Sequence, residues 1–271
     1  MILFANAKLN IGLQVIAKRT DGYHELNSVF YPLPIYDIIE LLETTAAETT
    51  LNIQGERIPG NLHDNLCIRA FELLKKDYGI PPVSIDLIKQ IPIGAGLGGG
   101  SADASFVLKG LNTLFQLNLT EEQLAGYAEK LGADCPFFIA NNPVFATGIG
   151  TDFKDLNLNL DGYHLVVIMP NIHISTAEAF AAVQPKVPEV SLEEAIRLPI
   201  QEWKFHIRND FEDGIFESYP LLKEIKETLY QKGAIYASMS GSGAAIYAIF
   251  WEKTDLSELA KYGRIYYPTK L

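Results

Sequence analysis

Hydrophobic and polar residues alternate along the first stretch of the chain, the pattern of a half-buried β-strand. The apolar face carries Leu9, Ile11, Leu13 and Val15. Lys8 and Asn10 lie next to each other on the polar face of this predicted strand. The pair Asp21-Gly22 then favours a tight hairpin turn, after which a second strand runs from Tyr23 toward Phe30.

After residue 65 the apolar residues recur at the spacing of an α-helix. Asn65 is a good N-cap, apolar residues recur at helical spacing over 66–78, and Gly79 with the prolines behind it ends the segment. An alternating run over 83–88 predicts a strand that leads into a glycine-rich stretch.

Two further helices are predicted beyond that stretch. One begins near Ser101, where apolar residues again share one face. The other begins at Thr120, which forms a capping box with Gln123, and it runs to Leu131 before Gly132 stops it.

The pattern restarts beyond about residue 155, so we predict two domains, residues 1–155 and 156–271. The elements expected in the second part are a strand over 165–169, a helix over 176–182, a long polar connection to 202, a helix from Pro220 to Gly233, and a hairpin of 235–239 and 244–250. Strands and helices are mixed rather than strictly alternating, which favours an α+β fold over a doubly wound α/β fold.

Composition narrows the function classes. The 271 residues include 22 basic and 33 acidic side chains, and a net charge of −11 argues against a general nucleic-acid or membrane-surface binder. Cys67 and Cys135 predict buried free thiols, and the five histidines lack the HxxxH spacing of a zinc site. The start lacks the pattern of a signal peptide and the longest apolar run, 244–251, is too short to span a membrane, so we expect a soluble cytoplasmic protein.

Residues 94–101, Gly-Ala-Gly-Leu-Gly-Gly-Gly-Ser, carry the strongest chemical signal. Glycines expose backbone N–H groups, and the helix that follows adds its own, so the segment suits a phosphate. A structural strand-to-helix corner is the alternative. A dinucleotide fold would next need a strand ending in an acid, but Glu121 and Glu122 open another helix. A P-loop lacks its Lys-Ser/Thr, and the HRD and DFG motifs of protein kinases are absent.

The segment Pro92–Ala102 resembles the phosphate loop of the GHMP small-molecule kinases. Four other segments extend the resemblance along nearly the whole chain: Ala7–Asn10, Asp21–His24, Leu131–Pro136 and Gly241–Gly243. The segments with Lys8, Tyr23-His24 and Asp134 narrow it to members that phosphorylate the 2-hydroxyl of a cytidine-diphosphate-linked methylerythritol, in non-mevalonate synthesis of isopentenyl diphosphate.

The resemblance implies a ribosomal S5 domain 2-like nucleotide domain and a ferredoxin-like substrate domain with the active site between them. It also implies ATP and Mg²⁺, a small-molecule acceptor, and a monomer or weak homodimer. One departure concerns Ala102, which stands where the family usually has a second hydroxyl residue, and this leaves the ligands of Mg²⁺ open.

The same resemblance assigns site residues. The ATP-binding segment is Pro92, Ile93, Gly94, Ala95, Gly96, Leu97, Gly98, Gly99, Gly100, Ser101 and Ala102. The catalytic pair is Lys8 and Asp134: the aspartate would orient the hydroxyl and take its proton late, and the lysine would keep it ionised and offset charge on the transferring group. The substrate-binding set is Asn10, Tyr23, His24, Thr176 and Phe180.

Each assignment has a structural alternative. Lys8 could be a solvated edge lysine and Asp134 the N-cap of a short helix. Phe180 fits the core face of a helix, although it could also clamp a cytosine against Tyr23, and His24 could be an ordinary surface histidine near a turn. The turn over 240–243 could be only a hairpin connection. Near the adenine, Asn65 and Lys89 are explained equally well as a helix cap and a surface lysine.

Three other functions stay open at this point. Another family member, such as a homoserine or mevalonate kinase, is disfavoured by Lys8 and Tyr23-His24. A dinucleotide-dependent oxidoreductase would rest on the GxGxxG pattern alone. A nucleic-acid-binding relative of the S5-like fold is disfavoured by the negative charge.

Overall fold

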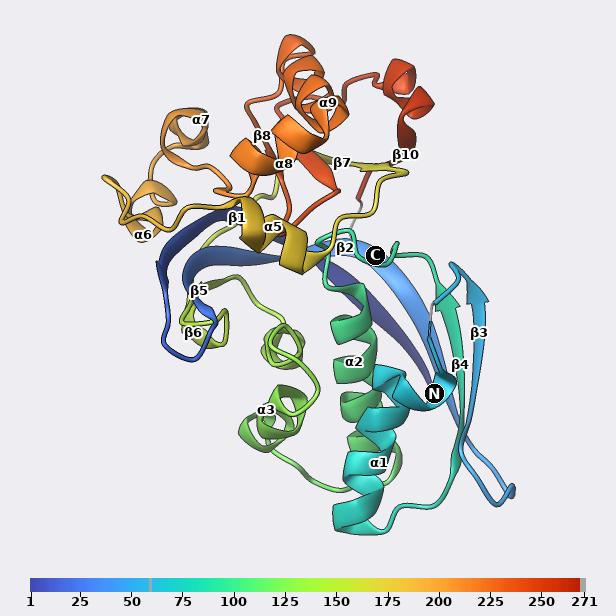
Figure 1. Ribbon diagram of the computed structural model, residues 1–271. Coiled ribbons are helices and arrows are strands. Elements are labelled where there is room, and N and C mark those ends of the chain that lie inside the picture. The colour runs from blue at the N-terminus through green and yellow to red at the C-terminus, as the bar shows by residue number, and fades with distance from the viewer. Residues whose placement is uncertain (59, 269–271) are drawn as a thin grey trace. The chain divides into compact units, whose positions relative to one another are not determined.

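The structure is a computed structural model that describes residues 1–58 and 60–268 (Figure 1). Helices and strands are mixed along the chain, which confirms the α+β class. The chain forms two compact units from interleaved segments. Residues 1–7, 34–93 and 98–142 make the first unit, and residues 8–33, 94–97 and those from 143 onward make the second. The predicted division near residue 155 cuts the chain only once, and it remains a prediction.

The first unit combines a sheet with helices. Its strands are part of β1 (Ile2–Lys18), part of β2 (His24–Glu43), β3 (Thr50–Gly55) and β4 (Val83–Lys89). Its helices are η1 (Leu62–Asp64), α1 (Leu66–Tyr78), α2 (Gly99–Leu114), α3 (Glu121–Glu129) and α4 (Phe137–Ala140). Strand β4 pairs antiparallel with β2 and parallel with β3.

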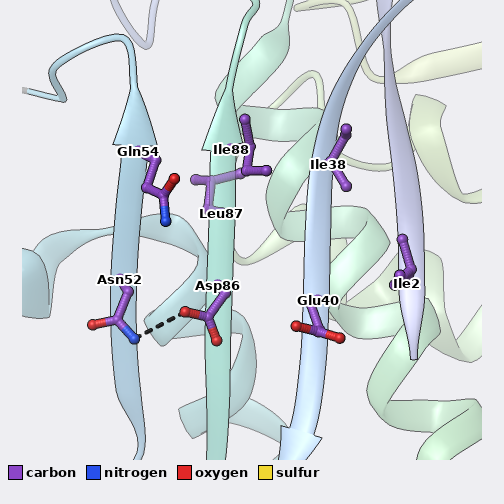
Figure 2. A pocket seen from close by; sticks show the side chains of 8 residues that line it. All are labelled: Ile2, Ile38, Glu40, Asn52, Gln54, Asp86, Leu87 and Ile88. Atoms are coloured by element: carbon purple, nitrogen blue, oxygen red, sulfur yellow. Dashed lines mark hydrogen bonds between the residues drawn. The ribbon is translucent and has the colours of Figure 1, made fainter.

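Alternation decides which face of this sheet is buried. Ile39 and Leu41 of β2 and Leu87 of β4 are buried, while Ile88 points to the opposite face and is 42% exposed. Figure 2 shows that opposite face, with the helices behind the strands. One layer of helices therefore covers one side of the sheet.

The second unit contains the remaining elements. Its strands, besides the rest of β1 and β2, are β5 (Val144–Thr147), β6 (Asp152–Asp155), β7 (His164–Pro170), β8 (Tyr236–Met239), β9 (Ile246–Phe250) and β10 (Gly263–Tyr266). Its helices are α5 (Thr176–Ala182), α6 (Leu192–Ala195), η2 (Ile200–Glu202), α7 (Trp203–His206), α8 (Glu212–Ser218), α9 (Pro220–Gln231) and η3 (Ser257–Lys261).

A four-stranded antiparallel sheet in the order β10–β7–β9–β8 organises the second unit. Apolar residues of α5, α8 and α9 share one core with the inner face of this sheet; Ile215, Leu222 and Ile246 are fully buried there. Residues 28–30 of β2 pair with β5, which in turn pairs with β6. The core thus fixes the strands that flank the turn over 240–243.

Element ends differ from the sequence expectation where the governing signal is backbone conformation rather than periodicity. Helix α2 begins at Gly99, before Ser101, because Gly98 takes a left-handed conformation at the N-cap with φ 68°. Strand β2 continues to Glu43 instead of stopping near Phe30. Helix α3 ends at Glu129 rather than Leu131, and the long polar connection expected up to residue 202 contains the short helices α6 and η2. The cap of α1 by Asn65 and Gly79 is confirmed.

Two helix glycines allow the helix-end signal to be tested with one kind of substitution. Gly79 ends α1 at φ 63°, whereas Gly126 lies inside α3, and a Cβ at either position would meet open space. We expect Gly79→Ala to lower the free energy of unfolding by about 1 kcal/mol, because a left-handed conformation strains an L side chain. Gly126→Ala should raise it by about 1 kcal/mol through helix propensity. Urea unfolding of both variants measures the two changes, and shifts of equal sign would contradict this account.

Candidate active site

Lys8 and Asn10 of β1 form a buried polar pair. Their side chains are 4% and 2% exposed, because both faces of β1 are covered along residues 5–15. The Lys8 ammonium donates to Asn10 Oδ1 over 2.6 Å and lies 4.3 Å from the centre of the Phe30 ring. The alternative of a solvated edge lysine is therefore wrong, and the predicted neighbourhood of Lys8 and Asn10 is confirmed.

Asn10 is held through several of its polar atoms. Its side-chain amide donates to Ser28 Oγ over 2.9 Å, and its backbone N–H donates to Ser240 Oγ over 3.1 Å. The Tyr247 hydroxyl donates to its carbonyl oxygen over 3.1 Å. Because these bonds fix the donor and acceptor ends of the side chain, the Asn10 amide presents a defined orientation to Lys8.

The first half of the glycine-rich segment joins this pair within the second unit. The Lys8 N–H donates to the Leu97 carbonyl over 2.9 Å, and the Ser240 hydroxyl donates to the Gly96 carbonyl over 2.8 Å. Gly96 has φ 76°, and a Cβ there would lie 1.9 Å from the Ser240 carbonyl oxygen. The glycine at 96 is needed both for its conformation and for this close backbone approach.

Two buried residues that the sequence reasoning missed hold the 240–243 turn. Asn209, 2% exposed, donates from its amide to the carbonyls of Met239 and Gly241 over 2.9 and 2.7 Å. Glu212 accepts from the Met239 N–H over 2.8 Å and pairs with Lys226 over 2.6 Å. The only sequence signal was a polar group, Arg-Asn-Asp, between the apolar Ile207 and Phe211. These bonds fix the turn between β8 and β9, and its participation in the site stays a prediction.

The second half of the glycine-rich segment belongs to the first unit and opens α2. Gly98 caps the helix with its carbonyl, which accepts from the Ala102 N–H over 2.9 Å. The N–H groups of the first helical turn have no partner inside the helix, so they are available to an anion. A Cβ at Gly100 would meet open space among the described residues.

Side chains after the glycines point inward. Ala102, the departure from the family pattern noted in the sequence, is fully buried. The Ser105 hydroxyl donates to the Ser101 carbonyl over 2.8 Å and lies 2.7 Å from the Cys135 carbonyl oxygen. Ser105 thereby ties α2 to the turn that precedes α4.

Asp134 lies in that turn and is half-buried. Helix α4 begins behind Pro136, which has no side-chain cap, so the alternative of Asp134 as the N-cap is wrong. Asp134 belongs to the first unit and Lys8 to the second, and their pairing stays a prediction.

Both cysteines are free and buried as expected, and burial raises the pKa of the Cys135 thiol to about 11.

Aromatic residues of the predicted substrate set meet in the second unit. His24 stacks on Phe180, with ring centroids 4.6 Å apart and an interplanar angle of 17°. Tyr23 follows the predicted turn and is 61% exposed. Thr176 is the first residue of α5, behind the Ser175 cap, and it is also exposed. The structure therefore pairs Phe180 with His24, and the clamp of Phe180 with Tyr23 stays a prediction.

The two residues considered for the adenine differ from each other. Asn65 caps α1, its side chain accepting from the Cys67 N–H over 2.8 Å. Lys89 is 2% exposed and pairs with Asp37 and Asp103, so its interpretation as a surface lysine is wrong.

Residues 1–58 and 60–268 contain no helix long and apolar enough to cross a membrane. The same described residues hold no group of three or more His, Cys, Asp or Glu side chains that could bind a metal ion.

A shallow pocket on the outer sheet face of the first unit contains none of the predicted site residues (Figure 2). Its lining is Ile2, Ile38, Glu40, Asn52, Gln54, Asp86, Leu87 and Ile88.

We expect Gly96→Ala to lower the free energy of unfolding by roughly 2–4 kcal/mol, because the new Cβ collides with the Ser240 carbonyl and strains the backbone. Gly100→Ala is the matched control, since its Cβ meets open space at the start of a helix, and it should leave stability unchanged or slightly higher. Guanidinium unfolding decides, and a Gly96→Ala protein as stable as wild type would refute the close approach.

Two family models and several known relatives match this chain. The GHMP kinases N terminal domain matches residues 65–142 and the GHMP kinases C terminal domain matches residues 192–269. A 4-diphosphocytidyl-2-C-methyl-D-erythritol kinase of Bacteroides thetaiotaomicron is 50% identical over 260 residues, 95% of each chain. The enzyme of that name from Porphyromonas gingivalis is 44% identical and covers 96% of each chain.

Solved structures confirm the fold. A crystal structure of 4-(cytidine 5'-diphospho)-2C-methyl-D-erythritol kinase superposes with a TM-score of 0.83 at 31% identity, covering 99% of this chain and 98% of that one. The mevalonate kinase of Methanococcus jannaschii reaches 0.73 at 16% identity, covering 100% of this chain and 98% of that one, and shares the fold alone. The chain therefore belongs to the GHMP kinase family, in the branch whose curated members carry the name 4-diphosphocytidyl-2-C-methyl-D-erythritol kinase.

Proposed function

We propose that this chain transfers the γ-phosphoryl group of ATP to the 2-hydroxyl of 4-diphosphocytidyl-2-C-methyl-D-erythritol, a step toward isopentenyl diphosphate. The names of relatives at up to 50% identity support the acceptor. The observation that carries the chemistry is the buried Lys8, a cation whose own backbone N–H is bonded to the glycine-rich segment at Leu97.

ATP would bind along residues 92–102. Positive φ angles at Gly94, Gly96 and Gly98 let the backbone curl around an anion, and the first turn of α2 supplies N–H groups at the positive end of the helix dipole. Phosphoryl transfer depends on positioning and on electrostatic stabilisation of the phosphates, and a backbone cradle of this kind would supply the positioning.

In the proposed reaction the acceptor oxygen forms a bond to the γ-phosphorus while the bond from phosphorus to the bridging oxygen of ADP breaks. The hydroxyl proton passes to the Asp134 carboxylate. Because the transition state is loose, this transfer is needed late, and an ionised aspartate held by a nearby ammonium suffices. Lys8, fixed by Asn10 and Phe30, would supply that ammonium and offset charge on the transferring group.

Mg²⁺ would accompany ATP and neutralise charge on its phosphates. The described residues offer no cluster of metal-binding side chains. The usual ligands of Mg²⁺ bound with a nucleotide are waters, phosphate oxygens and one or two carboxylates.

The acceptor would be recognised mainly through its cytosine and polyol. The stacked rings of His24 and Phe180 offer a flat apolar surface for a base, with the exposed Tyr23 next to His24 in the chain. Asn10 and Thr176 would contact the polyol or the diphosphate. In the domain division we propose, residues 1–155 bind ATP and residues 156–271 contribute to the acceptor site.

Other members of the fold are weaker candidates. A homoserine kinase of Cytophaga hutchinsonii and the mevalonate kinases match at 16–17% identity, which supports the fold but not their substrates. A dinucleotide-binding unit is excluded because α2 leads into the helix α3 rather than a strand.

We further propose that the reaction takes place in the cytoplasm, where ATP and a water-soluble acceptor are available. We also propose that the protein is a monomer or a weak homodimer.

We expect ADP release to depend on the cytidylyl acceptor in the wild-type protein, with homoserine and mevalonate as poor acceptors. Asp134→Asn should reduce kcat by at least about a hundredfold, because it removes the proton acceptor, and Lys8→Met should have an effect of similar size. A coupled spectrophotometric assay of ADP measures both.

Matched controls are Asp213→Asn and Lys223→Met, whose side chains are 81% and 63% exposed, and both should retain wild-type turnover. Turnover of Asp134→Asn within a few-fold of wild type would overturn its role, and turnover with homoserine or mevalonate alone would overturn the acceptor.

Phe180→Leu tests the recognition of cytosine while keeping an apolar side chain on the core. We expect the KM for the acceptor to rise about tenfold, because stacking on an aromatic ring contributes about 1–3 kcal/mol per base, while the KM for ATP stays unchanged. Phe205→Leu serves as control, since Phe205 is 68% exposed. An unchanged acceptor KM in steady-state kinetics would remove Phe180 from the site.

A further inference from the structure

Lys89, the last residue of β4, is a fully buried charged residue that the proposed reaction does not use. Its ammonium pairs with two carboxylates, Asp37 of β2 and Asp103 of α2. The three side chains are 1%, 0% and 4% exposed. We call them the Lys89 cluster; all three residues belong to the first unit.

The Lys89 cluster holds the chain at both ends of the glycine-rich segment. Asp37 Oδ1 accepts from the N–H groups of Gln90 and Ile91, over 2.5 and 2.8 Å, where the chain leaves β4. Lys89 Nζ lies 2.9 Å from Asp103 Oδ2, one turn into the helix that follows the segment. A single group of charges therefore fixes where the segment begins and where it ends.

The Lys89 ammonium also explains why residue 99 is a glycine. A Cβ at this first residue of α2 would lie 2.9 Å from Lys89 Nζ and 2.9 Å from the Ile91 side chain. The absence of a side chain lets the ammonium approach the first turn of the helix. The ammonium and the start of α2 are thus packed directly against each other.

Stability alone does not account for the Lys89 cluster, because burying charged groups is unfavourable and apolar side chains of similar volume often stabilise a core as well or better. Burial raises the pKa of Asp103 to about 8; the Lys89 ammonium opposes this shift and the Asp37 carboxylate adds to it. Asp103 Oδ1 has no hydrogen-bond partner among the described residues.

We propose that Lys89, Asp37 and Asp103 are positioning residues that hold the ends of the glycine-rich segment at the spacing required by the triphosphate of ATP. The proposal rests on the proposed function only in taking ATP as the ligand. Loosening the cluster should therefore weaken ATP binding and leave recognition of the acceptor unchanged.

The test is ATP binding to the full chain by isothermal titration calorimetry. Asp103→Asn keeps an oxygen that can accept from the Lys89 ammonium, so its Kd for ATP should stay near the wild-type value. Asp103→Ala removes the contact, and its Kd should rise about tenfold, the effect of losing one charge-assisted hydrogen bond. In steady-state kinetics the ATP KM should rise in the same variant while the acceptor KM stays constant.

Lys109→Met is the matched control. It removes another ammonium of α2, one that donates to the Ile139 carbonyl over 3.1 Å, and it should leave the Kd for ATP unchanged. An Asp103→Ala protein that binds ATP like wild type, or one in which the KM values of both substrates rise together, would overturn the proposal.

Hydrogen exchange on the wild-type protein gives a second measurement if Asp103→Ala does not fold. The amides of Gln90 and Ile91 should exchange slowly without ATP, and fast exchange there would overturn the proposal. Wild-type protein that binds ATP without phosphorylating the acceptor, while Asp103→Ala binds it less tightly, would overturn the proposed acceptor and support the Lys89 cluster. A wild-type protein that does not bind ATP would overturn both.

Discussion

The close approach of Gly96 to Ser240 is the constraint on which the second unit's share of the site depends. The Ser240 carbonyl oxygen occupies the space of any side chain at residue 96. At this contact the Ser240 hydroxyl can reach both the Gly96 carbonyl and the Asn10 N–H. Three segments far apart in sequence are joined there by one side chain, so the position of Lys8 relative to residues 94–97 follows from a backbone contact rather than from its own flexible side chain.

Buried polar residues donate or accept hydrogen bonds at the glycine-rich parts of the chain, which have no side chains to pack. Glycine-rich stretches have little to pack, so they depend on hydrogen bonds supplied by neighbours. Asn209 and Glu212 hold the 240–243 turn, and Asp37 holds the chain behind β4. Each of these residues is buried, and an unmatched partner would carry a full desolvation penalty. The buried polar side chains of this protein thus fix glycine-rich segments that could not fix their own conformation by packing.

Local signals in the sequence were sufficient to predict the ends of helices that carry their own capping residues. The helix from Asn65 to Gly79 and the start of α3 at Thr120 follow from side chains within one turn. The position of Lys89 needed more than this, yet a signal existed: Lys89 has the same parity along β4 as the buried Val83 and Leu87. Its partner in α2 could not be inferred, because a contact between β4 and a helix over ten residues later depends on tertiary packing. Asn209 was missed for the same reason, since its partners lie about thirty residues away in the chain.

The interleaving of the two units sets the order in which they can be completed during synthesis. The first unit has all its segments once residue 142 has been made. Residues 8–33 have to wait longer, because Asn10 bonds to Ser240 and Tyr247, which are made well after residue 142. A ribosome translating this message therefore leaves β1 without these partners until residue 247 has been made, and a chaperone could protect the strand during this interval.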